Sequence, residues 1–251
     1  MKVFPTIFSK KNSPTPKKKN FQAPKKVFRL LWFFVGLTIL FCFSVAFFAP
    51  LVKATKALDY FDYVSELRSN VLTVSQKDYS LRVYALEREY PYVADGVRRE
   101  MSSYAEIHFS APSGDRSCKI TFNANGKTFN GEMSYDNVKG EYFYSASADL
   151  TNTESLAVQI TYGDETLRLN ALTVKKTNTL SPRELLGKLQ ENEKETFASL
   201  TDGNAFIGEI YLRLICEDEP YYYVGLITKD GKIRAYLLTA DTGKVLAKRE
   251  S

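Results

Sequence analysis

The sequence has very little histidine, cysteine or tryptophan: its 251 residues include one His, three Cys and one Trp. This scarcity excludes most zinc sites and histidine-based catalytic triads. The sequence also contains neither a glycine-rich phosphate loop nor a G-x-S-x-G nucleophile motif. We therefore expect a protein that is not an enzyme and that holds no metal or cofactor.

Acidic residues are missing from the first 56 positions, where ten Lys and Arg29 give a formal charge of +11. Residues 57–251 contain the other 23 basic residues and all 29 acidic ones, so their formal charge is −6. Proteins that bind nucleic acid carry a basic surface on the binding domain. This split therefore argues against nucleic acid as a partner, and the 44% apolar content excludes a wholly disordered chain.

Charged residues are also absent from positions 30–49, which read LLWFFVGLTILFCFSVAFFA. Twenty helical residues rise ~30 Å, which is the thickness of the hydrocarbon core of a bilayer. We therefore predict a transmembrane signal-anchor helix over residues 28–52, with the lipid bilayer as a partner. Residues 1–27 contain four prolines among Lys and Ser, and they predict a disordered basic tail.

The charges on either side of the apolar run predict its orientation. Nine basic residues precede the run, whereas only Lys53 and Lys56 follow it closely. Positive charge stays on the cytoplasmic side, so the N-terminus is expected in the cytoplasm and the C-terminal part outside the plasma membrane. A cleaved signal peptide is the alternative, but the apolar run is longer than a usual signal core. The tail is either a topology signal or a segment that lies on anionic lipid, through Lys17, Lys18, Lys19, Lys25, Lys26 and Arg29.

Residues 53–78 contain neither Pro nor Gly and follow the apolar run directly. Ala57, Val64 and Val71 recur every seven residues, and other apolar residues fill the intermediate positions. This spacing predicts a helical stalk, which could pair as a coiled-coil dimer through residues 57–74 or remain a monomeric helix.

Residues 79–176 change to a period of two, with a turn signal every 8–15 residues. Cys118, Ile120 and Phe122 share one face of a predicted strand, and seven such strands fit the segment. Asn125-Gly126 suits a tight hairpin because both residues tolerate a positive φ. This pattern predicts an immunoglobulin-like β-sandwich domain.

Residues 181–251 predict a small α+β module, a helix followed by an antiparallel meander. Ser181 and Glu184 form a capping box with Pro182 at the first helical position. Four strand candidates follow, over 206–216, 221–228, 232–239 and 244–248. The predicted fold class is thus mostly β with one transmembrane helix, a sandwich and a C-terminal α+β module.

The end of this module resembles a PepSY-type domain. The segments YYYVGLI (221–227), KDGK (229–232) and AYLLTADTGKVL (235–246) are similar to its "YxV" strand, turn and D-x-x-T-G-x-V close. That family consists of envelope and secreted modules regarded as inhibitors or regulators of peptidases, without catalytic residues. The whole chain also resembles uncharacterised single-pass cell-envelope proteins of Gram-positive bacteria.

Cys118 and Cys216 lie on the inward faces of predicted strands in different domains. We expect both to be free thiols in core positions, although an exported disulfide is chemically allowed. His108, without a nearby nucleophile or carboxylate pair in the sequence, is expected to be structural or to lie on the surface.

Exposed tyrosines are enriched at binding surfaces, because the ring and the hydroxyl supply contact area at low entropic cost. The candidate partner-binding residues are Tyr142, Tyr144, Tyr221, Tyr222 and Tyr223. The alternative is that they reflect ordinary β-propensity. We predict a non-catalytic, membrane-anchored binding, scaffold or regulatory protein of the cell envelope with an envelope protein as its partner. The alternative is a regulator of an envelope peptidase, and a hydrolase with paired carboxylates is a more distant one.

Overall fold

The computed structural model describes residues 58–90, 97 and 99–251. Residues 57–251 form one compact unit. Among the described residues, no helix is both long and apolar enough to cross a bilayer. The expected tail (1–27), the transmembrane helix (28–52) and the lipid-contacting residues Lys17, Lys18, Lys19, Lys25, Lys26 and Arg29 lie outside the described residues.

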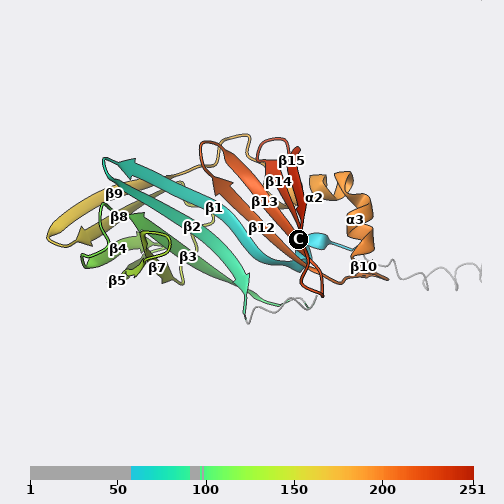
Figure 1. The fold of residues 1–251 in the computed structure, drawn as a ribbon, viewed down its shortest axis with the longest axis horizontal. Coiled ribbons are helices and arrows are strands. Elements are labelled where there is room, and N and C mark those ends of the chain that lie inside the picture. Colours follow the sequence, from blue (N-terminus) through green and yellow to red (C-terminus); the bar gives the residue numbers. More distant parts are fainter. Residues whose placement is uncertain (1–57, 91–96, 98) are drawn as a thin grey trace, which may run out of the picture. The chain divides into compact units, whose positions relative to one another are not determined.

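Strands dominate the described part, as the alternating pattern predicts (Figure 1). Its helices are a short 3₁₀ helix η2 (Tyr60–Tyr63), α2 (Pro182–Asn192) and α3 (Lys194–Ser199). The strands are β1 (Val64–Gln76), β2 (Tyr79–Glu89), β3 (Met101–Ser110), β4 (Cys118–Ala124), β5 (Lys127–Glu132), β6 (Ser134–Asp136), β7 (Glu141–Ala146), β8 (Ser155–Tyr162), β9 (Glu165–Thr173), β10 (Thr201–Asp202), β11 (Ala205–Phe206), β12 (Glu209–Cys216), β13 (Pro220–Ile227), β14 (Ile233–Thr239) and β15 (Val245–Glu250).

The prediction of a helical stalk over residues 53–78 is wrong for its described part, because residues 64–76 form strand β1. This strand pairs with β2, β9 and β12. A bulge between Arg68 and Asn70 shifts its phase, and the adjacent residues Val71 and Leu72 belong to different cores. When a bulged strand is buried on both sides, the spacing of its apolar residues can resemble that of a heptad repeat. A coiled coil through residues 57–74 is therefore wrong as well, whereas the possible dimer through these residues stays a prediction.

The first hydrophobic core lies between two layers of strands in the N-terminal half of the unit. Leu81 of β2 and Ile107 of β3 come from one layer, and Ile120 of β4 and Ile160 of β8 come from the other. These four side chains are at most 1% exposed. The predicted hairpin between β4 and β5 is confirmed, with Asn125 at φ 50° and Gly126 at φ 75°. A layered β-structure is thus present, and its immunoglobulin-like type stays a prediction.

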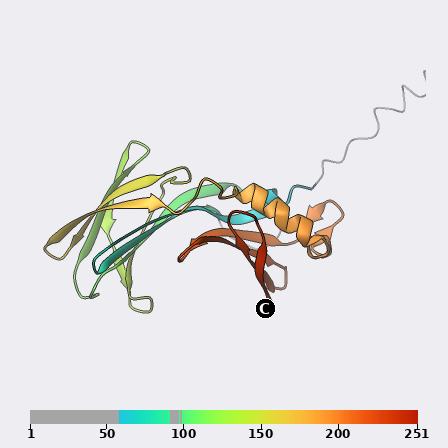
Figure 2. The ribbon, with the colours of Figure 1, turned by 90° about the horizontal axis from the view of Figure 1, so that it is seen from above.

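The second core lies between the helices and the meander β12–β15. The capping box is confirmed, since the Ser181 side chain accepts from the Glu184 N–H and the Glu184 carboxylate accepts from the Ser181 N–H. Helix α2 buries Leu185, Leu186 and Leu189 in the same core as the meander residue Leu212. Figure 2 shows α2 and α3 along one side of the meander, while no described helix or strand lies along the other.

The two predicted domains, 79–176 and 181–251, share one sheet. Strand β12 pairs with β1 in parallel, and every other strand pair in the described part is antiparallel. The resulting order is β15-β14-β13-β12-β1-β2-β3-β7-β6. Because β1 supplies residues to both cores, the boundary predicted at residue 79 separates segments that fold together.

Candidate functional site

Two of the five candidate tyrosines are core residues. Tyr142 is 2% exposed and its hydroxyl donates to the Arg116 carbonyl at 2.7 Å. Tyr222 is fully buried and its hydroxyl donates to the Leu180 carbonyl at 2.9 Å. Burial raises the pKa of Tyr222 to about 12. The prediction that Tyr142 and Tyr222 bind a partner is therefore wrong, because neither ring reaches the surface.

The other three candidates are half-buried. The Tyr144 hydroxyl donates to the Asn130 carbonyl at 3.2 Å, and its ring packs against the first core. Tyr221 and Tyr223 lie on the side of β13 opposite to Tyr222, as strand geometry requires. The structure therefore brings only Tyr221 and Tyr223 together on one surface.

Tyr221 and Tyr223 belong to a sheet face that contrasts sharply with the helix-covered side. On β12, Ile210, Leu212 and Leu214 are completely buried, whereas the alternate residues Tyr211, Arg213 and Ile215 are half-buried. On β14, Leu238 is completely buried, whereas Leu237 is half-buried. The half-buried residues are cross-strand neighbours, since Arg213 pairs with Tyr223 and Tyr223 pairs with Leu237. We call this side of β12–β14, with its continuation over β1, β2 and β3, the open face.

Charged side chains continue the open face across β1, β2 and β3. The Glu66 carboxylate accepts from Arg213 Nε at 2.6 Å and from Arg88 Nε at 3.2 Å. Burial alone would raise the pKa of Glu66, but the hydrogen bond and charge of Arg213, with the charge of Arg88, hold this pKa below its ordinary value. Arg88 also lies 3.8 Å from Glu106. Glu66 thus joins the C-terminal meander to the β1–β2 hairpin.

A second charge cluster lies further along the same face. His108 is buried, and its Nδ1 lies 2.7 Å from Glu141 Oε1. The other carboxylate oxygen of Glu141 accepts from Arg82 at 3.3 Å. His108 is therefore structural, as expected, although its carboxylate partner comes from β7 and could not be found in the local sequence.

Arg68 lies between these two clusters and forms no ion pair within the described part of the chain. Its guanidinium carbon is 4.0 Å from the centre of the Tyr84 ring. Its Nε is buried without a hydrogen-bond acceptor. Arg68 lines a pocket of about 440 Å³, together with Arg82, Tyr84, Glu106, His108, Lys139 and Glu141.

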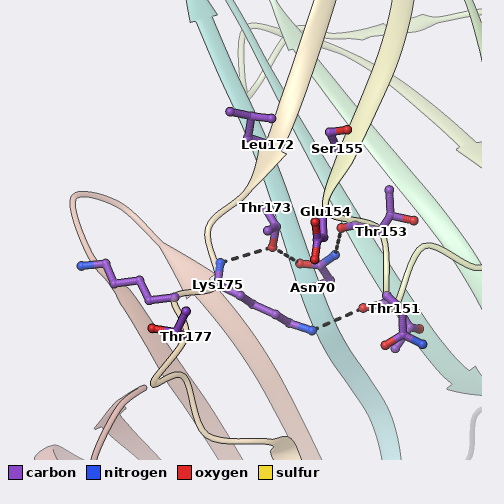
Figure 3. Close-up of a pocket in the computed structure, with 11 residues that line it drawn as sticks. Asn70, Thr151, Thr153, Glu154, Ser155, Leu172, Thr173, Lys175 and Thr177 are labelled. Atoms are coloured by element: carbon purple, nitrogen blue, oxygen red, sulfur yellow. Dashed lines mark hydrogen bonds between the residues drawn. The ribbon is translucent and has the colours of Figure 1, made fainter.

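A pocket of about 820 Å³ lies on another part of the unit, where β1, β9 and the 151–155 segment meet (Figure 3). Asn70 is 1% exposed, its amide donates to the Thr153 carbonyl at 2.8 Å, and its oxygen accepts from Thr173 at 2.6 Å. The Lys175 ammonium donates to the Thr151 carbonyl at 3.3 Å, and burial lowers the pKa of Lys175. These hydrogen bonds connect β1 and residues 173–175 to residues 151–153, so we assign the pocket a structural role.

The described cysteines are free. Cys118 is buried, and burial raises its pKa to about 12. Cys216 is half-buried rather than buried, and burial with the nearby Glu219 and Asp218 charges raises its pKa. Over the described ranges, no group of three or more His, Cys, Asp or Glu side chains is placed to hold a metal ion.

No family model matches this chain, and no curated protein or solved structure matches it either. The candidate site therefore depends on the geometry alone. Sequence reasoning missed the charged residues of the open face, because their partners lie on strands far apart in the chain. The only local signal was the alternation of Arg82, Tyr84 and Arg88 on one side of β2.

Proposed function

We propose that this chain is a single-pass, membrane-anchored protein whose extracytoplasmic unit binds another envelope protein through the open face, without catalysis. The observation that carries the proposal is the difference between the two sides of the meander. One side packs against α2 and α3, whereas the other leaves Tyr221, Tyr223 and Leu237 half-buried. Half-exposed tyrosines beside an arginine are the residues that protein interfaces favour.

The arginines of the open face also favour a partner of negative charge. Arg213, Arg88, Arg82 and Arg68 all lie on the open face, in a unit whose formal charge is −6. The occupant that fits best is an acidic segment of a partner protein, because opposite potentials steer association and set the register.

A photo-crosslinking residue at position 223 of the full chain, expressed in its own membrane, tests this proposal. We expect a discrete adduct with one protein from position 223, and a much weaker one after Tyr221→Ala. The matched control places the same crosslinker at Leu172, an exposed residue of β9 (55%) away from the meander. Equal adducts from positions 223 and 172 would refute the open face as the binding surface.

The second candidate function is regulation of an envelope peptidase by the C-terminal module. The element order over residues 182–250 favours this candidate. A helix is followed by an antiparallel meander, which is the order that the PepSY resemblance implies. Deleting residues 181–251 would not test it, since the deletion removes β12, the partner of β1. The full chain should instead slow the cleavage of a model substrate by the crosslinked partner, if that partner is a peptidase. Unchanged cleavage would eliminate this candidate.

A further inference from the structure

On the open face, Arg68 is the arginine for which the described residues supply no ion pair. Arg68 sits opposite Arg213 on β12 and Leu86 on β2. The nearest carboxylates are engaged elsewhere: Glu66 by Arg88 and Arg213, and Glu106 by Arg88. Glu141, across the pocket, is engaged by Arg82 and His108.

This arrangement is costly for the folded unit. A guanidinium nitrogen that is removed from water without an acceptor loses hydration that the described part of the protein does not replace, and this holds for Arg68 Nε. The Tyr84 ring compensates part of the charge through a cation–π contact. The orphaned Nε shows that the hydrogen-bonding capacity of Arg68 is not satisfied within the described residues.

The pocket beside Arg68 has the charge and size for an anionic group. Arg68, Arg82 and Lys139 contribute three cationic side chains, against the carboxylates of Glu106 and Glu141. Its volume of about 440 Å³ is ample for a side chain that carries a carboxylate. A bound anion would supply the countercharge that the described part of the chain leaves out.

We propose that this pocket receives a carboxylate side chain, Asp or Glu, from the acidic segment of the partner protein, with Arg68 as its principal cation. The inference deepens the proposed function and rests on it. Planar guanidinium and carboxylate groups match each other in charge-assisted hydrogen bonds, which are the stronger class of hydrogen bond. Tyr221 and Tyr223, on the same face, supply the apolar contact area for the rest of the segment.

The probe is a synthetic acidic peptide of alternating Glu and Gly with a terminal photo-crosslinker, added to the purified full chain in zwitterionic detergent. Adducts are mapped by mass spectrometry and counted separately on residues 1–56 and 57–251. The basic N-terminal segment attracts any acidic peptide, so adducts there serve as an internal reference. A Gln–Gly peptide is the matched probe without charge.

We expect Arg68→Gln to lower the adducts on the open face at least about tenfold relative to the reference, as for the loss of a charge-assisted hydrogen bond. Arg68→Lys should retain part of the signal. Arg116→Gln is the matched control, since Arg116 also lies over a tyrosine ring and pairs with a glutamate, but outside the pocket. A thermal melt of each variant confirms that it is folded.

Two outcomes would overturn the inference. One is an equal open-face signal for Arg68→Gln and Arg116→Gln. The other is competition by inorganic phosphate but not by free glutamate, which would make the pocket a phosphate site instead. If Arg68→Gln keeps the position-223 adduct with the native partner while Tyr221→Ala loses it, the proposed function survives and only the carboxylate site fails.

Discussion

Glu66 is the residue whose replacement should most clearly uncouple the two halves of the unit. Its side chain is 7% exposed, and its carboxylate accepts hydrogen bonds from arginines on β2 and β12. Glu66→Gln keeps the shape but removes the charge and turns one acceptor into a donor that faces a guanidinium. Each charge-assisted hydrogen bond contributes about 1.5–3 kcal/mol. The partners Arg88 and Arg213 are 40% and 32% exposed, so water can rehydrate them.

We therefore expect Glu66→Gln to lower the free energy of unfolding by about 2–3 kcal/mol. In a unit of this size, that loss corresponds to a fall in Tm of roughly 5–10 °C. Thermal unfolding followed by near-UV circular dichroism of the tyrosines measures it. The control is Glu132→Gln, since Glu132 is 81% exposed, pairs with Lys119 at 3.6 Å, and should change stability by less than about 0.5 kcal/mol.

The pH dependence supplies a second check with a defined sign. The pKa of Glu66 is lower in the folded state than its ordinary value of 4.5. The unfolded state therefore binds a proton first, and the stabilisation by Glu66 is complete above pH 4.5 and disappears as the pH falls through the folded pKa. The difference between wild type and Glu66→Gln should narrow below pH 4.5. A difference that stays constant into acid, or equal losses for Glu66→Gln and Glu132→Gln, would refute the reasoning.

Further predictions follow from the cores and the caps. Ser181→Ala should cost about 1 kcal/mol, because it removes the capping box of α2, and Ser181→Gly should cost less in the same urea titration. Leu212→Ala should cost about 2–5 kcal/mol, measured by the same titration, because Leu212 is completely buried in the second core. Asn70→Ala should lower the free energy of unfolding by about 1–3 kcal/mol, since two carbonyls lose their donor; a loss no larger than that of an exposed Asn would contradict this. Iodoacetamide should label Cys216 faster than the buried Cys118, whose pKa is about 12, and equal rates would show that Cys118 is accessible.

Strands that contribute side chains to a single core could be predicted from the sequence, because their apolar residues recur with a period of two. Strand β4, with Cys118, Ile120 and Phe122 inward, is an example. The α2 capping box could also be predicted, because Ser181 and Glu184 interact locally. Strand β1 could not, since it is buried against two cores and its bulge breaks the alternation.

In the candidate site too, local features could be predicted from the sequence, whereas contacts between distant residues could not. The alternation within YYY allowed Tyr221 and Tyr223 to be placed opposite Tyr222, but not the choice of which side faces the helices. That choice depends on α2 and β1, which lie far away in the sequence. The Glu66 contacts to Arg88 and Arg213 span 22 and 147 positions, so no local pattern could reveal them.

The shared strand β1 has a consequence for how the open face would work. Glu66 joins the meander to the β1–β2 hairpin, and Arg68, whose Nε has no acceptor among the described residues, lies two residues further along this strand. Their backbone is held by pairing with β2 on one side and with β12 on the other. A surface built on paired strands loses less conformational entropy on binding than one built on loops. Disruption of the Glu66 junction should therefore weaken partner binding at Tyr221 and Tyr223 without touching either ring, because it loosens the register between β1 and β12 that aligns both tyrosines of β13 with Arg68 across the sheet.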